Sequence, residues 1–251
     1  MKLLLVNGNT DSTITALILA RATEALPRLG LSHLRLEAVT ARFGARYIAT
    51  RAAVAIAGHA VLDALAAHLR PEHDGAVIAC FGEPGLEAAR EILPVPVQGM
   101  AEASLAIGHR IAPRIALLTG GTAWVPMLEE FCLMRGLGPD RVLVRAVAPT
   151  GGMIAADPEG ALALLAQAAR EAVAAGCGAV VLGGAGLAGL VPRLAAAVPV
   201  PLLDSLDCAL LRAAEAGTGG AMPFAPVAQA PQQGLATPLA ALLGRALAGA
   251  H

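Results

Sequence analysis

Aromatic residues are scarce in this sequence, and charge is not concentrated anywhere along it. The 251 residues include one Trp, one Tyr and four Phe, and the formal net charge is -1. Binding to a nucleic-acid backbone requires a concentrated basic patch, which no cluster of Lys and Arg provides here. We therefore expect no nucleic-acid partner. The apolar content is nearly all Ala, Leu and Val, which suits helices packed on a parallel sheet.

Cysteine motifs and ligand clusters are also lacking. The four cysteines, at positions 80, 132, 177 and 208, do not have the CxxC spacing of zinc sites and redox pairs. No phosphate-binding loop or suitably placed lysine is visible either, so we predict no metal, nucleotide or pyridoxal cofactor. The chain shows no secretory leader, which predicts free thiols in a reducing cytoplasm.

One uncharged stretch, residues 172–192, has the length of a membrane span. Its glycines divide it into a helix end, a short strand and a glycine-rich turn. We therefore predict no membrane segment. The glycines concerned are Gly176, Gly178, Gly183, Gly184, Gly186 and Gly189.

A unit of three parts recurs along the chain: a short apolar run, a cluster of small or polar residues, and a helical segment. Continuous apolar runs between helices indicate a mainly parallel sheet covered on both faces. In such folds the loops at the carboxyl ends of the strands meet at a common crevice, where the Cys80 and Gly184 loops should face each other. The apolar runs are 2–6, 75–79, 114–118, 179–182 and 200–203.

The spacing of these units predicts an α/β protein with two similar domains, each a mainly parallel sheet flanked by helices, and a site in the crevice between them. Residues 1–97 together with 205–251 are predicted to form domain one, which carries Cys80. Residues 98–204 are predicted to form domain two, which carries the Gly184 loop. Residues 217–238 are typical of a long loop, followed by a terminal helix at about 239–248.

Cys80 ends an apolar run and immediately precedes a turn and a helix. Backbone N–H groups and the positive end of a helix favour thiolate over thiol, so this position predicts a lowered pKa. A buried cysteine that acts as a small hydrophobe is an equally good interpretation of the position alone.

Four segments, in order along the chain, carry a resemblance to a known family. Residues 7–10, Asn-Gly-Asn-Thr, look like the Asn-Pro-Asn-Thr opening of hydantoin racemases, and residues 77–86 closely match that family's first cysteine motif. Residues 96–103 resemble its next strand and helix, and residues 181–187 resemble its second cysteine motif, Leu-Gly-Cys-Ala-Gly-Met. From Lys2 to about Ala216 the chain thus resembles the aspartate/glutamate/hydantoin racemase superfamily, and hydantoin racemases most of all.

The resemblance implies cofactor-independent chemistry at a carbon beside a carbonyl, with two thiols on opposite faces of the substrate. Cys80 matches one of these thiols, and Gly184 stands where the other would be. Cys132, Cys177 and Cys208 are not well placed to substitute for it.

The remaining loop residues are predicted to bind a planar carboxylate or imide. Backbone N–H groups in small-residue loops stabilise the negative charge of an enolate-like transition state, although each glycine is equally well explained by a tight turn. We predict backbone donors at Phe81, Gly82, Gly120, Gly121, Ala185 and Gly186, side-chain donors at Asn9, Thr10 and Thr119, and further substrate contacts at Asn7 and Gly184.

Several functions remain open. A racemase without its second thiol should be severely impaired, unless water replaces that thiol. A decarboxylase of a malonate-type acid needs one proton donor only. Arylmalonate decarboxylases resemble this arrangement, but their cysteine corresponds to Gly184, so this chain should yield product of the opposite hand.

A non-catalytic binder of small acids or cyclic amides is also compatible with the sequence, and so is a racemase in which Gly184 is an engineered substitution. The predicted partner is a small molecule, namely a hydantoin, an amino acid or a related small acid. The sequence allows a homo-oligomer without fixing its size.

Overall fold

Two parallel four-stranded sheets organise the chain, with strand orders β2-β1-β3-β4 and β6-β5-β7-β8. The structure, a computed structural model, describes residues 1–147, 157–218 and 232–248. Every pairing is parallel, which confirms the α/β class predicted from the sequence. The strands are β1 (Lys2–Asn7), β2 (Arg35–Thr40), β3 (Gly75–Ile78), β4 (Val97–Gly99), β5 (Ile115–Gly120), β6 (Val142–Val147), β7 (Ala179–Gly183) and β8 (Leu202–Asp204).

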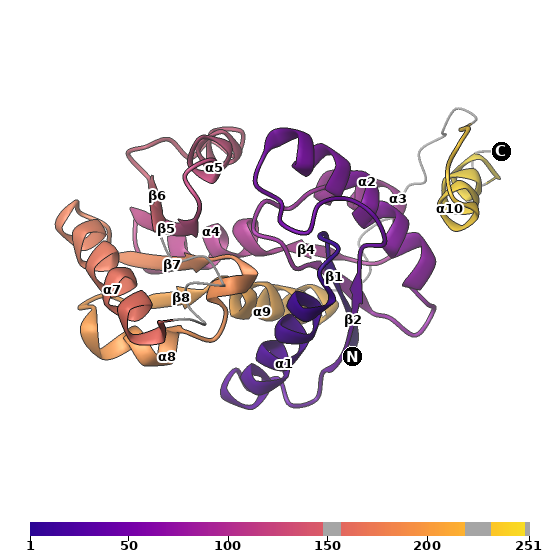
Figure 1. Cartoon of the computed structure of the whole chain (residues 1–251). Helices are drawn as coiled ribbons and strands as arrows, with labels where there is room; N and C mark the ends of the chain where they lie inside the picture. Colours follow the sequence, from indigo (N-terminus) through magenta and orange to yellow (C-terminus); the bar gives the residue numbers. More distant parts are fainter. Residues whose placement is uncertain (148–156, 219–231, 249–251) are drawn as a thin grey trace.

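Helices connect the strands and cover the sheets (Figure 1). Polar side chains cap the starts of three of them: Asp11 accepts the N–H of Thr13, Thr50 that of Ala53, and Asp157 that of Gly160. The helices are α1 (Ser12–Arg28), α2 (Arg51–His68), α3 (Leu86–Ile92), α4 (Met100–Ile111), α5 (Trp124–Leu133), α7 (Pro158–Ala174), α8 (Val191–Leu194), α9 (Ser205–Thr218) and α10 (Thr237–Ala248), with 3₁₀ turns η1 (Ala185–Leu187) and η2 (Ala195–Ala197).

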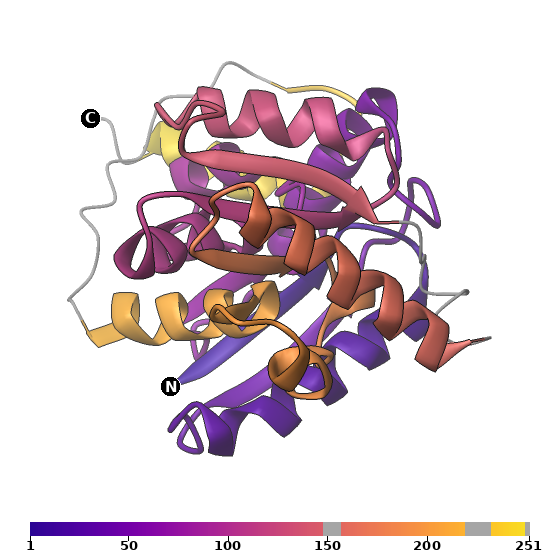
Figure 2. The same ribbon diagram turned by 90° about the vertical axis from the view of Figure 1, so that its left-hand side faces the viewer.

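The two sheets lie side by side, with α4 and α9 between them (Figure 1). In the view of Figure 2 the second sheet and its helices face the reader. Strand β4 belongs to the first sheet and β8 to the second, so the chain passes from one sheet to the other after Gly99 and returns after Asp204. The division into domains at residues 97 and 204 stays a prediction.

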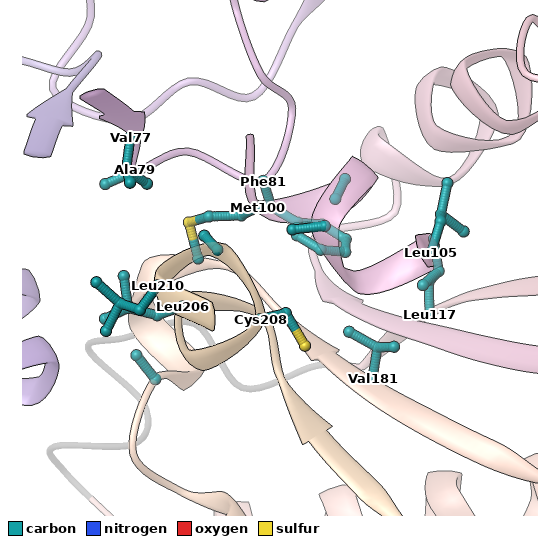
Figure 3. Close-up of a cluster of buried hydrophobic side chains, with 14 of the residues drawn as sticks. Val77, Ala79, Phe81, Met100, Leu105, Leu117, Val181, Leu206, Cys208 and Leu210 are labelled. Atoms are coloured by element: carbon teal, nitrogen blue, oxygen red, sulfur yellow. The ribbon is translucent and has the colours of Figure 1, made fainter. Parts of the chain in front are cut away.

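One apolar core joins the two halves. Phe81 comes from the first half, Val181 comes from the second, Met100 comes from α4, and Leu206 and Cys208 come from α9 (Figure 3). All five side chains are buried. The two halves are therefore joined through one shared set of buried side chains.

The uncharged stretch at 172–192 contains the end of α7, strand β7 and the glycine-rich turn η1, as predicted. None of the helices in the described part of the chain is both long and apolar enough to span a membrane. Most of the predicted loop at 217–238 lies outside the described residues, and the helix predicted after it is α10, which packs against α2 and α3.

Candidate functional site

A cavity of about 640 Å³ lies where the carboxyl ends of β1, β3, β5 and β7 converge. This is the edge at which parallel α/β sheets bind ligands. The cavity is lined by Asn7, Asn9, Asp11, Thr13, Ile14, Arg46, Tyr47, Ile48, Ala79, Cys80, Phe81, Gly82, Thr119, Gly120, Trp124, Gly183, Gly184, Ala185, Gly186 and Leu187.

The structure brings together the site residues predicted from the sequence, with two exceptions. Thr10 and Gly121 do not line the cavity. The backbone N–H of Thr10 donates to the carbonyl of Ala45 at 3.1 Å, and Gly121 forms a turn with a φ of +88°. Both residues support neighbouring loops instead of facing the cavity.

Cys80 follows β3 and is half-buried at the cavity wall. The other three cysteines, Cys132, Cys177 and Cys208, are buried and do not line the cavity. Burial raises the pKa of the Cys80 thiol from its ordinary value of 9.0 to about 11, although a hydrogen bond from the backbone N–H of Gly82 lowers it. The prediction of a lowered pKa was therefore wrong, because desolvation outweighs the backbone donors of the turn.

Gly184 lies in the loop after β7, in the other half of the cavity wall. Its backbone has a φ of +118°, a region that L side chains rarely adopt, and no atom lies within 4 Å of the position that a Cβ would occupy. Its N–H donates to the Oγ of buried Ser205 at 3.1 Å. Asp204 holds the end of the same loop, because its carboxylate accepts the N–H of Gly189 at 2.6 Å. The loop thus keeps a glycine conformation and leaves the space beside Gly184 open.

Two glycine–aromatic contacts connect the Cys80 loop to the second half. The Phe81 ring lies against Gly183, and the Trp124 ring lies against Gly82. A Cβ at either glycine would overlap the ring beside it. Phe81 therefore contributes a packing side chain as well as the backbone N–H predicted from the sequence.

The loop after β1 is held by the side chain of Asn7. Its Nδ2 donates to the Oδ1 of Asn9 at 2.9 Å and to the Oγ1 of Thr15 at 3.0 Å, and its Oδ1 accepts the N–H of Asn9 at 3.1 Å. Asn7 is buried while Asn9 is only partly buried. Asn7 therefore positions the loop that presents Asn9 to the cavity.

The segment between β2 and α2 contributes to the cavity wall, which was not predicted from the sequence. Tyr47 and Ile48 from this segment line the cavity; Tyr47 contacts the end of β5, and Ile48 contacts the start of α5. The Tyr47 hydroxyl donates to the carbonyl of Gly120 at 3.4 Å, and Nε1 of Trp124 donates to the carbonyl of Ile48 at 3.1 Å. The one available signal was rarity, because Tyr47 and Trp124 are the single Tyr and the single Trp of the chain.

The charged side chains that line the cavity neutralise each other. Arg46 forms an ion pair with Asp11 at 3.0 Å. Asp11 also accepts from the hydroxyl of Thr13, which with the Arg46 guanidinium lowers its pKa to about 2. The cavity therefore offers neutral hydrogen-bonding groups and apolar walls, without an unpaired charge among its lining side chains.

Glu83 supports the Cys80 turn from beneath. Its N–H donates to the carbonyl of Cys80 at 3.0 Å, and its buried carboxylate accepts the N–H of Glu102 in the first turn of α4 at 2.7 Å. Its φ is +48°, and the carboxylate occupies the space where a side chain at Gly99 would lie. Burial raises the pKa of Glu83 to about 8. The loop that carries the thiol is thus anchored to the start of a helix.

No group of three or more His, Cys, Asp or Glu side chains in the described residues is placed to hold a metal ion. The chemistry that can be assigned to the cavity is that of its thiol, its phenol and its hydrogen-bond donors.

Known racemases are similar to this chain in sequence and in fold. The family model described as Asp/Glu/hydantoin racemase matches residues 3–213. The hydantoin racemase of Paenarthrobacter aurescens is 31% identical over 213 residues, covering 83% of this chain and 88% of that protein. The solved structure of allantoin racemase from Klebsiella pneumoniae superposes with a TM-score of 0.83 at 26% identity, covering 96% of this chain and 98% of that one.

A more distant structure shares the fold alone. It is a liganded variant of arylmalonate decarboxylase with one glycine-to-cysteine and one cysteine-to-serine substitution. Its TM-score is 0.65 at 18% identity, covering 89% of this chain and 96% of that one.

Proposed function

Because the chain belongs to the Asp/Glu/hydantoin racemase family, we propose that it catalyses cofactor-independent proton transfer at a carbon next to a carbonyl, with Cys80 as the acid/base. One observation carries the proposal. Cys80 is the one cysteine that lines the cavity formed by the converging strand ends, and backbone N–H groups of small-residue loops surround it.

The proposed reaction begins when the Cys80 thiolate removes a proton from the substrate carbon. The electron pair of the broken C–H bond moves towards the carbonyl oxygen, where an enolate forms. The N–H groups of Gly120 and Gly186 are candidates to donate to that oxygen, and preorganised donors of this kind supply a large part of the rate enhancement of many enzymes. Because the thiol pKa is about 11, the fraction of thiolate is small at neutral pH and increases about tenfold for each unit of pH below that value.

The cavity lining favours a neutral cyclic amide as substrate. A free amino acid brings two charges and a malonate brings two negative charges, while the charged residues Asp11 and Arg46 already pair with each other. Burying an unpaired charge costs much more than burying an amide that forms hydrogen bonds. Ile14, Ile48 and Trp124 supply an apolar wall for a substituent on the ring. A 5-substituted hydantoin has this combination of groups.

A second candidate function is decarboxylation by a single thiol, and the raised pKa of Cys80 favours it. In this reaction the C–C bond to a carboxylate breaks and carbon dioxide leaves. The electron pair forms an enolate without a base, and the Cys80 S–H donates its proton to the carbon. Water then returns a proton to the thiolate. A thiol that stays protonated at neutral pH suits this donor role.

The deciding experiment uses 5-substituted hydantoins, amino acids and arylmalonates in D₂O, with mass spectrometry and chiral chromatography as readouts. We expect deuterium to enter the hydantoins, and Cys80→Ser to abolish the exchange. Cys177→Ser is the matched control, because this thiol is buried in the apolar core of the second half, away from the cavity.

Each outcome assigns a function. Deuterium incorporation with inversion supports a racemase, whereas loss of carbon dioxide from an arylmalonate supports the decarboxylase. Binding without Cys80-dependent turnover of any compound contradicts both enzymatic functions and supports a binding protein for small acids or cyclic amides.

A further inference from the structure

Racemisation requires a proton-exchanging group on each face of the substrate carbon, and Gly184 offers none. The cavity lining contains four ionisable side chains, those of Asp11, Arg46, Tyr47 and Cys80. Asp11 is held ionised by Arg46 and Thr13, and an Arg side chain keeps its proton in proteins. Among the described lining residues, Tyr47 is therefore the one ionisable side chain besides Cys80 that can both lose and regain a proton.

The Tyr47 hydroxyl lies on the side of the cavity that belongs to the second sheet. It donates to the carbonyl of Gly120, the last residue of β5. Strand β5 pairs with β7 in a register that places Thr119 opposite Gly183, the residue before Gly184. Tyr47 and Gly184 both line the cavity, and the hydroxyl is held at the end of the strand that pairs with the strand leading into Gly184.

The phenol is positioned from two directions. Its oxygen lies 3.2 Å from the place where a Cβ of Gly121 would be, so glycine at 121 leaves room for it. The next residue, Ile48, is tied to the second half by the 3.1 Å hydrogen bond from Trp124. The bond from the phenol to Gly120 is long at 3.4 Å, so the O–H group can turn to a substrate at small cost.

We propose that Tyr47 is a second catalytic residue, which exchanges a proton with the substrate carbon on the face opposite Cys80 and takes the place of the missing thiol. This inference rests on the proposed proton-transfer function. Cys80 removes the proton from one face and becomes S–H, and the electron pair forms the enolate. The Tyr47 O–H then donates its proton to the same carbon from the other face and becomes a phenolate. Water carries a proton from the thiol to the phenolate and restores the starting state.

The charge balance of the cavity is consistent with this order of events. Tyr47 is 56% exposed, and partial desolvation together with the charge of a Cys80 thiolate raises the pKa of its phenol, which therefore carries its proton at neutral pH. The same sequence run backwards, with Tyr47 removing the proton and Cys80 donating one, converts the other enantiomer.

Tyr47→Phe tests the proposal, because it removes the hydroxyl and keeps the ring. Each enantiomer of a 5-substituted hydantoin is incubated with the enzyme in D₂O, and deuterium content and chirality are measured separately. We expect inversion to fall by about 100-fold or more, the size typical of a lost general acid or base. Exchange with retention should persist in the enantiomer whose C–H bond faces Cys80, because the thiol exchanges its proton with D₂O.

Phe43→Leu is the matched control for disturbance of the same segment, because Phe43 does not line the cavity and its ring meets that of His59 edge to face. This variant should invert the substrate at the rate of the unmodified protein. A loss of activity caused only by a distorted segment would lower exchange and inversion together in Tyr47→Phe.

The inference and the function on which it rests fail in different ways. If the unmodified protein exchanges deuterium without inversion, or if Tyr47→Phe inverts as fast as the unmodified protein, the role of Tyr47 is refuted and the role of Cys80 stands. If no Cys80-dependent exchange occurs in the unmodified protein, the proposed function itself is refuted.

Discussion

Replacing Glu83 by glutamine should change how the stability of the protein depends on pH. The carboxyl of Glu83 is buried, one of its oxygens accepts the N–H of Glu102, and the other has no hydrogen-bond partner. Its pKa is about 8, against an ordinary value of 4.5. Arg90 and Arg135 face this carboxyl from neighbouring elements, and Glu102 opposes its ionisation.

The raised pKa of Glu83 fixes the sign of the effect. Between pH 4.5 and about 8 the folded protein keeps a proton that the unfolded chain has released, so the free energy of unfolding falls as pH rises through this range. At about 1.4 kcal/mol for each unit of pH, the total loss is roughly 5 kcal/mol. The glutamine side chain of Glu83→Gln cannot ionise, so the variant should not show this decrease in the free energy of unfolding with pH. The amide also places a donor where no partner is available, which costs about 1–3 kcal/mol at every pH.

The assay is urea unfolding at pH 5, 7 and 9, followed by circular dichroism and by the fluorescence of Trp124, the single tryptophan. We expect Glu83→Gln to be less stable than the unmodified protein at pH 5 and to gain on it by several kcal/mol by pH 9. Glu129→Gln, which removes the same charge from an exposed position on α5, should parallel the unmodified protein. Parallel curves for Glu83→Gln would refute the argument, because they would mean that Glu83 titrates near its ordinary pKa.

Three further substitutions test the geometry of the cavity. Gly82→Ala should lower the free energy of unfolding by about 1–3 kcal/mol, because its Cβ would overlap the Trp124 ring. Thermal unfolding measures the effect. The control, Gly244→Ala, changes an open position in α10 and should not destabilise the protein. Gly184→Cys should cost about 1–3 kcal/mol despite the open space, since its φ of +118° disfavours any side chain; equal melting temperatures with the unmodified protein would contradict this. Ser205→Ala removes the acceptor for the N–H of Gly184 and should raise KM. Expressed as a free energy, the increase in KM from steady-state kinetics should exceed the decrease in the free energy of unfolding from a denaturation curve.

The interior strands of both sheets could be predicted from the sequence, but the edge strands β2 and β6 could not. Strands β3 and β7 are buried along their whole length, so they appear in the sequence as unbroken apolar runs. Strand β2 alternates exposed and partly buried residues, and β6 carries Arg145 among its apolar residues. Such edge strands have no continuous run, and neither was predicted.

The same difference between interior and edge strands explains which residues of the candidate site could be predicted. Cys80, Thr119 and Gly184 lie at or just after the carboxyl ends of interior strands, and these ends meet for reasons of topology alone. Tyr47 follows the edge strand β2 and reaches the cavity only because its segment folds over the second half, which no local pattern indicates. The pKa of Cys80 was mispredicted because the degree of burial depends on the complete fold.

The two glycine–aromatic contacts couple the residue identities at two pairs of positions in the cavity wall. Phe81 needs a residue without a side chain at 183, and Trp124 needs one at 82, although each pair joins distant parts of the chain. During evolution neither member of a pair is free to change alone, so the pairs should be inherited together. A transplant of the Cys80 loop into a related scaffold must therefore include Gly183 and Trp124 as well. Without them, the side chains that pack against the loop and orient the thiol would be missing.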